Sequence, residues 1–164
     1  MKIRQATVFA VTFIITTALL SGCFDAVRGS GRTEAFSYQN AGFNQIQISG
    51  AFEFDIRHGE SYSVNIEADD NLSEYIKVVQ EADLLRIGTE NLSIIGTATL
   101  KAVVTLPEIS NLNISGACRG SITGFNIPEA VEIVLSGASS LELISMNTGL
   151  ATLKISGASK ANGN

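Results

Sequence analysis

Few side chains in this sequence combine the residue type and the spacing that catalysis or metal binding requires. His58 is the only histidine, and it stands in an Arg-His-Gly-Glu segment that is typical of a surface turn. No group of His, Cys and Glu residues has the spacing of a zinc site, and the Gly-x-Ser-x-Gly elbow of a serine hydrolase is missing. We therefore expect a protein without catalytic residues, without a bound metal and without a cofactor.

Two groups of polar residues leave alternatives open. Asp69, Asp70 and Asn71 offer the oxygen ligands that Ca²⁺ takes, but without EF-hand spacing, so capping of a short helical turn is the favoured interpretation. Glu108 and Glu129 each follow a proline and share a phase one repeat apart. They could form the acid–base pair of a polysaccharide-cleaving enzyme, although solvated turn residues are the favoured interpretation.

Cys23 is the one residue to which the sequence assigns a definite modification. Basic residues at positions 2 and 4 precede an uncharged run over residues 6–20, and small residues follow, which is the layout of a secretory signal. The segment Leu-Ser-Gly-Cys that ends at Cys23 resembles the bacterial lipobox. This resemblance implies cleavage before Cys23 and its acylation, with palmitate among the acyl chains.

The same segment also indicates which membrane the protein reaches. Because residue 24 is Phe rather than Asp, the resemblance to bacterial lipoproteins implies sorting to the outer membrane. An uncleaved membrane anchor is the alternative. The apolar run over residues 6–20 is, however, shorter than the roughly 20 residues that span a bilayer.

The composition describes the chain that remains after cleavage. Its length, from position 23 to position 164, suits one domain. The sequence has 11 Lys and Arg against 16 Asp and Glu, and two of the basic residues lie in the part removed. This acidic balance argues against a nucleic-acid partner, which a basic surface would bind. Acylation of Cys23 would leave Cys118 without a disulfide partner. We interpret Cys118 as a small buried residue rather than a reactive thiol.

The sequence repeats one phrase, an apolar residue followed by Ser-Gly-Ala, at Ile48, Ile114, Leu135 and Ile155. The last three copies recur with a period of about 20 residues, which is typical of stacked repeats. The first copy precedes the second by roughly three such periods. The serines should form a hydroxyl ladder, which we interpret as a tightly packed corner. A face that binds an ordered polymer is the alternative.

Alternation of apolar and polar residues predicts strands beside each phrase. The same apolar phase recurs in each repeat, at Leu112 and Ile114, at Ile133 and Leu135, and at Leu153 and Ile155. The sequence therefore predicts an all-β fold, a right-handed parallel β-helix with coils of about 20 residues that bury a continuous apolar column. A β-sandwich is the alternative, because a strand spacing of about 8 to 12 residues also suits one.

Several longer segments together resemble the head GIN domain family. They are the Gly-Ser-Gly segment near residue 30, the strand into ISGAFEFDI, EADDNL, VTLPEISNLNISGA, and the later LSGAS and ISGAS copies. The resemblance covers roughly residues 35–162. The family is described as auto-transporter adhesin heads of bacterial envelopes, which implies a secreted β-helical domain and brings neither a catalytic residue set nor a known ligand.

These observations predict a lipoprotein signal peptide over residues 1–22, a lipidated flexible tether over 23–34, and a GIN-like β-solenoid domain over 35–164. Because Asn164 follows the last phrase by less than one coil, a C-terminally truncated domain is the favoured interpretation. The predicted function is a non-enzymatic adhesion or interaction module, lipid-anchored in the cell envelope, whose ligand is an extracellular or periplasmic protein or glycan. The alternative is a periplasmic lipoprotein with a structural or regulatory partner.

Overall fold

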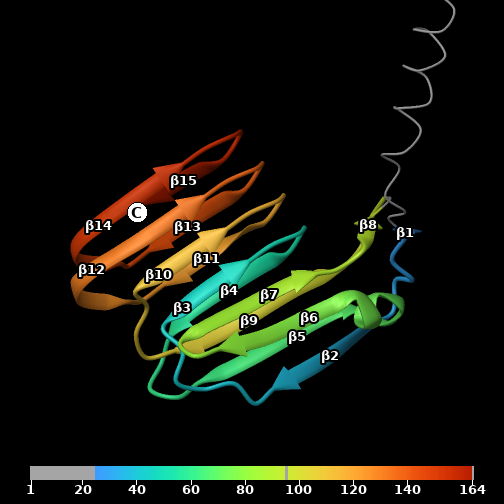
Figure 1. The fold of residues 1–164 in the computed structure, drawn as a ribbon, viewed down its shortest axis with the longest axis horizontal. Coiled ribbons are helices and arrows are strands. Elements are labelled where there is room, and N and C mark those ends of the chain that lie inside the picture. Colours follow the sequence, from blue (N-terminus) through green and yellow to red (C-terminus); the bar gives the residue numbers. More distant parts are fainter. Residues whose placement is uncertain (1–24, 95, 164) are drawn as a thin grey trace, which may run out of the picture.

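The fold is built almost entirely from short strands (Figure 1). The structure is a computed structural model that describes residues 25–94 and 96–163. Six strands form one large sheet, seven form a second, and two form a small separate ladder. Buried residues from both large sheets make one apolar core. The protein is therefore all-β, with two mixed sheets in a sandwich-like arrangement.

The strands of each large sheet lie in an order that differs from their order along the chain. The six-stranded sheet runs β14 (Asn147–Ile155), β12 (Asn126–Leu135), β10 (Asn111–Ile114), β3 (Gln45–Ile48), β7 (Leu84–Thr89) and β6 (Ile76–Glu81). The seven-stranded sheet runs β15 (Lys160–Gly163), β13 (Ser140–Ile144), β11 (Arg119–Thr123), β4 (Glu53–His58), β9 (Leu100–Leu106), β5 (Ser63–Asp69) and β2 (Thr33–Tyr38).

The remaining elements are short. Strands β1 (Asp25–Val27) and β8 (Leu92–Ile94) pair with each other in parallel. A 3-10 helix, η2 (Asp70–Tyr75), follows β5. Among the described residues, no helix has both the length and the apolar character needed to cross a membrane.

Five layers make up the centre of the fold, and each layer contains one strand from each of the two large sheets. We call each layer a rung, which consists of one strand of the six-stranded sheet and the next strand along the chain that enters the seven-stranded sheet. In spatial order, rung 1 is β7 and β9, rung 2 is β3 and β4, rung 3 is β10 and β11, rung 4 is β12 and β13, and rung 5 is β14 and β15. Neighbouring rungs pair in parallel in both sheets.

The apolar phase predicted for the repeats is confirmed. Leu112 pairs with Ile133 and Ile114 pairs with Leu135. Rung 5 continues both columns, because Ile133 pairs with Leu153 and Leu135 with Ile155. The side chains at these positions in rungs 3 and 4 are buried, and each buried Leu or Ile contributes about 1.5–3 kcal/mol. The columns therefore account for much of the stability of the stack.

The interval between the first two phrases is roughly three repeat periods long, but it does not place three coils between them. Ile48 of the first phrase pairs directly with Ile114 of the second, so rungs 2 and 3 are neighbours. The intervening residues complete rung 2 with β4, and the later strands β5, β6, β7 and β9 lie on the other side of rung 2. Here β5 and β6 run antiparallel to rung 1. A change of strand direction ended the repeat, which the spacing alone did not reveal.

Two parts of the segment expected to be a flexible tether, residues 25–27 and 33–34, belong to strands in the structure. Strand β1 pairs with β8, and β2, which begins at Thr33, runs antiparallel to β5 at the edge of the seven-stranded sheet. The backbone of Asp70 also donates to the carbonyl of Arg32 at 2.8 Å. Cys23 and the predicted signal peptide over residues 1–22 lie outside the described residues.

Candidate functional site

The Ser-Gly-Ala phrases stack into one edge of the molecule, which we call the Ser-Gly-Ala edge (residues 49–51, 115–117, 136–138 and 156–158). Successive phrases are joined by backbone hydrogen bonds. The N–H of Ala138 donates to the carbonyl of Gly116 at 2.7 Å, and that of Ala158 to the carbonyl of Gly137 at 2.8 Å. The phrase glycines have φ values between +70° and +104°, a region that favours glycine.

The same glycines leave no room for a side chain. A Cβ added at Gly137 would lie 2.3 Å from the carbonyl oxygen of Gly116. Two of the phrase serines use their hydroxyls on the neighbouring strand: Ser136 Oγ donates to the Ile114 carbonyl at 3.5 Å, and Ser156 Oγ to that of Leu135 at 3.4 Å. These contacts support the interpretation of the repeat as a packed corner.

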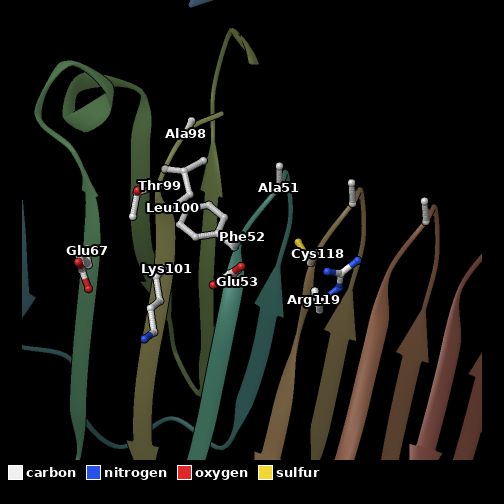
Figure 2. Close-up of a pocket in the computed structure, with 12 residues that line it drawn as sticks. Ala51, Phe52, Glu53, Glu67, Ala98, Thr99, Leu100, Lys101, Cys118 and Arg119 are labelled. Carbon is white, nitrogen blue, oxygen red and sulfur yellow. The ribbon is translucent and has the colours of Figure 1, made fainter. Parts of the chain in front are cut away.

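A charged groove lies beside this edge, on the seven-stranded sheet. We call it the edge groove. It has a volume of about 460 Å³, and its lining includes the alanines of the first three phrases together with Glu53, Glu67, Lys101 and Arg119. Strand register places these four side chains in one row, since Glu67 pairs with Lys101, Lys101 with Glu53, and Glu53 with Arg119. Figure 2 shows Lys101 between the strands of Glu67 and Glu53. Negative and positive charges therefore alternate across the groove.

The four charged groups of the edge groove are exposed and uncommitted. Within the described part of the chain, none of them lies within 4.0 Å of an opposite charge. By contrast, Arg57, on the same strand as Glu53, is paired with Asp55. Unpaired carboxylates accept hydrogen bonds, and unpaired ammonium and guanidinium groups donate them. The groove therefore has the chemistry to bind a polar ligand that carries both donors and acceptors.

Cys118 lies beneath the edge groove and is 1% exposed, which confirms the prediction of a small buried residue. Its Sγ donates to the carbonyl of Ser115 at 3.3 Å. Burial raises the pKa of the Cys118 thiol, an effect that a backbone hydrogen bond from Phe52 partly opposes. The thiol is therefore held in its neutral form and does not have the thiolate character that a nucleophile needs.

The other residues considered from the sequence lie away from the edge groove. His58 ends β4, is exposed, and packs edge-on against Phe125 with ring centroids 5.7 Å apart. Glu108 and Glu129 line one small pocket of about 240 Å³ between rungs 3 and 4. Both residues are exposed to solvent, which confirms that they are solvated. Glu108 lies in a loop as expected, whereas Glu129 lies within β12 at its register shift rather than in a turn. Neither His58 nor the pair of glutamates therefore contributes to the edge groove.

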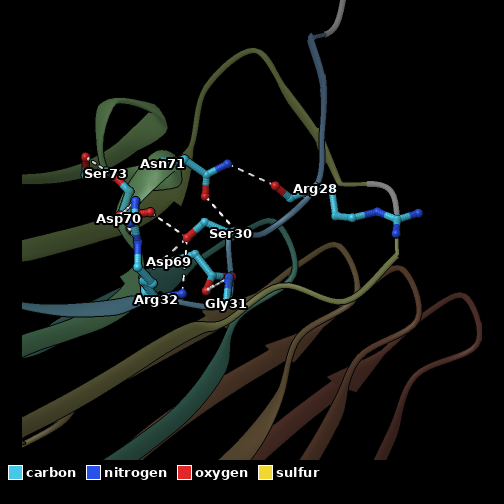
Figure 3. A network of polar contacts seen from close by, with 8 residues as sticks. All are labelled: Arg28, Ser30, Gly31, Arg32, Asp69, Asp70, Asn71 and Ser73. Atoms are coloured by element: carbon cyan, nitrogen blue, oxygen red, sulfur yellow. Dashed lines mark hydrogen bonds and ion pairs between the residues drawn. The ribbon is translucent and has the colours of Figure 1, made fainter.

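Asp69, Asp70 and Asn71 hold the segment that leads into β2, and Figure 3 shows the contacts. Asp69 is 2% exposed, and its carboxylate accepts from the backbone N–H of Gly31 at 3.1 Å and from that of Thr99 at 2.8 Å. The predicted helical turn is present as η2, but the Asp69 side chain makes no capping bond to it. It binds residues distant in the sequence instead.

The two residues after Asp69 complete this contact. Asp70 accepts from Ser30 Oγ at 2.5 Å and pairs with Arg32 at 2.7 Å. The Ser30 hydrogen bond, helped by Arg32, lowers the pKa of the Asp70 carboxyl. Asn71 accepts from the N–H of Ser30 at 3.0 Å and donates to the carbonyl of Arg28 at 2.9 Å. These oxygens thus bind N–H and O–H donors. The described residues contain no group of three or more potential metal ligands.

Fold and groove together define the class of protein as an all-β domain of stacked rungs. The family profile described as "Putative auto-transporter adhesin, head GIN domain" matches residues 42–164. The chain belongs to this family, as the sequence segments indicated. No curated protein matches the chain.

Solved structures show the same fold. A putative adhesin from Parabacteroides distasonis has a TM-score of 0.74 and 18% identity, covering 85% of this chain and 60% of its own. A putative lipid binding protein from the same organism has a TM-score of 0.67 and 18% identity, covering 85% and 70%. A putative adhesin from Parabacteroides merdae has a TM-score of 0.54 and 17% identity, covering 73% and 59%. This chain thus spans 60% of the first of these proteins.

Sequence reasoning missed the edge groove, although part of its signal was visible. Glu53 and Arg119 each stand two residues after a Ser-Gly-Ala phrase, so the repeat alone places them on neighbouring strands. Lys101 and Glu67 come from segments without the phrase. Their place in the row depends on β5 and β9 lying beside rung 2, which no sequence period indicated.

Proposed function

We propose that the protein is a non-enzymatic adhesion or interaction module of the bacterial cell envelope that binds a protein or glycan through the edge groove. The observation that carries this proposal is the row of four exposed, unpaired and alternating charges beside the Ser-Gly-Ala edge. Membership of an adhesin-type family supports it. The buried, neutral thiol of Cys118 argues for binding rather than nucleophilic chemistry at this place.

We also propose that the five rungs are coils of a β-solenoid. The chain passes from the six-stranded to the seven-stranded sheet within each rung, and the Ser-Gly-Ala phrase recurs at the same place in rungs 3, 4 and 5. In such a stack each coil buries its apolar side against the next. The Ser-Gly-Ala edge would then be the corner of successive coils, and the edge groove would lie beside this corner.

Exposure on the cell decides between adhesion and a periplasmic role. We expect the full chain, carrying a C-terminal tag, to be digested by proteinase K on intact cells, with a periplasmic protein protected in the same sample. Protection until the outer membrane is opened would contradict direct adhesion. It would favour the alternative of a periplasmic lipoprotein with a protein partner.

Charge reversal in the groove tests the binding surface itself. Lys101→Glu combined with Arg119→Glu makes the whole row acidic, and we expect at least about tenfold weaker attachment of cells to the glycan- or protein-coated surface that the unaltered protein binds best. Lys77→Glu changes the charge on the opposite sheet and is the matched control. Equal attachment by all three proteins would show that the groove is not the binding surface.

The lipid anchor rests on Cys23. If the lipobox interpretation is correct, Cys23→Ala should leave an uncleaved precursor that incorporates no palmitate, because the acyl chains attach to this cysteine. Metabolic labelling with palmitate and the electrophoretic mobility of the product measure this outcome. Labelling and processing that persist in Cys23→Ala would disprove the assignment, and Cys118→Ala is the control.

A further inference from the structure

A second pocket lies at the end of the seven-stranded sheet that is opposite to the Ser-Gly-Ala edge. We call it the tyrosine pocket (residues 37–41 and 62–65), and its volume is about 340 Å³. Strand register pairs Ser63 with Thr105, and Thr105 with Arg57, which places the start of β5 beside the ends of β9 and β4. The pocket lies where β2 ends (Figure 1). Its size falls in the range of small-ligand sites, about 300–1,000 Å³.

Two of the three tyrosines of the chain line this pocket. Tyr38 is the last residue of β2, and Tyr62 directly precedes β5. Both are half-buried against the apolar core, and the Tyr62 ring packs on that of Phe43 with centroids 5.1 Å apart. Within the described part of the chain, neither hydroxyl has a hydrogen-bond partner. The pocket therefore offers aromatic rings fixed by packing and hydroxyls that are free to donate and accept.

Gln80, on β6 of the other large sheet, fixes the loop that forms one wall of the pocket. Its Oε1 accepts from Asn40 Nδ2 at 3.2 Å, and its Nε2 donates to the carbonyl of Ala41 at 2.8 Å and to that of Ala82 at 2.9 Å. The loop after β2 is thus tied across the two sheets. A wall held in this way has its shape before a ligand arrives, which reduces the entropic cost of binding.

The polar groups of the tyrosine pocket are hydroxyls and amides, and its lining over residues 37–41 and 62–65 is uncharged. Ser37 Oγ donates to Asn65 Oδ1 at 2.7 Å, which leaves the amide N–H groups of Asn65 free. The side chains of Gln39 and Ser63 make no hydrogen bond to any described residue. Hydroxyls and amides both donate and accept without carrying charge. The edge groove, by contrast, is lined by four charged groups.

This lining selects a neutral ligand that is rich in hydroxyl groups. A carboxylate or an ammonium group that entered the pocket would lose its hydration without gaining an opposite charge, which is costly. A purely apolar ligand would leave the hydroxyls and amides of the pocket unpaired. A sugar ring meets both requirements, because its C–H groups pack on aromatic rings and its hydroxyls both donate and accept.

We propose that the tyrosine pocket binds a neutral sugar residue. The sugar ring contacts Tyr38 and Tyr62, and its hydroxyls bond to the free phenol groups and to the free amides of Gln39 and Asn65. The edge groove lies at the opposite end of the same sheet. The sugar site is therefore separate from the function proposed for the edge groove and does not depend on it.

Methyl glycosides of glucose, galactose, mannose and N-acetylglucosamine test the proposal against the full chain held in nanodiscs of neutral phosphatidylcholine. Saturation-transfer NMR measures binding. Tyrosine fluorescence reports on the pocket, because the sequence has no tryptophan and two of its three tyrosines line the pocket. We expect at least one glycoside to bind with a dissociation constant below about 10 mM. The uronic acid and the amino sugar that correspond to this glycoside should bind at least about tenfold more weakly.

Two variants that keep the size of the side chain provide the matched test. Tyr38→Phe removes one free hydroxyl, and Asn65→Asp keeps the acceptor for Ser37 but loses the free N–H donors. Each should weaken the tightest glycoside about three- to tenfold. Tyr75→Phe, in η2, and Lys101→Glu, in the edge groove, are the controls and should leave binding unchanged.

Four outcomes would overturn the proposal. They are the absence of binding by every neutral glycoside at about 10 mM, equal binding of the charged counterparts, unchanged binding in both Tyr38→Phe and Asn65→Asp, and weakened binding in Lys101→Glu. The last would place the sugar in the edge groove instead.

Discussion

Gly137→Ala should lower the free energy of unfolding by about 2–5 kcal/mol, the sum of a steric and a conformational cost. The new Cβ would lie 2.3 Å from the carbonyl oxygen of Gly116, which is backbone and cannot move without shifting rung 3. Overpacking of this kind costs about 1–3 kcal/mol. The φ of +76° at Gly137 adds about 1–2 kcal/mol for any residue with a Cβ. Urea unfolding followed by far-ultraviolet circular dichroism measures the change.

Gly42→Ala separates the two costs. Gly42 has the same φ of +76°, but nothing lies within 4 Å of a Cβ added there. This control should therefore lose only the conformational part, about 1–2 kcal/mol. If Gly137→Ala were no more destabilised than Gly42→Ala, the phrases would not be in the close contact that the structure shows, and the corner interpretation of the repeat would be wrong.

Asp69→Ala should release the segment before β2 from the body of the protein. The substitution leaves the N–H groups of Gly31 and Thr99 without their acceptor at a buried position. Each hydrogen bond to a charged group contributes about 1.5–3 kcal/mol. Cleavage by trypsin after Arg28 and Arg32 should therefore accelerate at least about tenfold, because proteolysis follows the population of the open segment. Mass spectrometry of the fragments gives the rates at each site.

Asp83→Ala is the control for this variant, since Asp83 is an exposed aspartate whose side chain accepts from Gln45 elsewhere on the molecule. A similar trypsin rate in Asp69→Ala and in the unaltered protein would show that Asp69 does not hold the segment.

The neighbouring Asp70 gives a prediction for acid pH. The pKa of the Asp70 carboxyl is lowered in the folded state. The ionised carboxylate therefore stabilises the fold fully above the ordinary aspartate pKa of about 3.9, and this stabilisation is lost as the pH falls through the lower pKa of the folded state. The Ser30 and Asn71 amide signals should report that loss.

The parts of the fold that the sequence predicted correctly are those that repeat locally. Leu112 and Ile114 share their phase with Ile133 and Leu135, and the structure pairs these residues. Such a pattern is readable because each buried column requires the same residue type at the same place in every rung. Cys118 was assigned correctly for the same reason, since its position after the phrase matches that of the buried Phe52.

The parts that the sequence did not predict depend on contacts between distant segments. The interval between Ile48 and Ile114 is compatible with three coils, and no residue in it shows that the chain instead reverses direction at β5. The row of charges in the edge groove was missed because Lys101 pairs with Glu53 although the two residues lie far apart in the sequence. The contacts of the segment before β2 could not be predicted from the sequence, because their partners, such as Asp69, lie far along the chain.

The position of rung 2 has a consequence for the order of folding during synthesis. Rung 2 leaves the ribosome first, yet its neighbours on both sides come from later residues, with rung 1 in 84–106 and rung 3 in 111–123. Closing these long loops is the slow step, whereas rungs 4 and 5 each join a finished neighbour that lies only one repeat back in the chain. We therefore expect folding to be slow until residue 123 has been synthesised, and rungs 4 and 5 to fold rapidly, one after the other, once they follow.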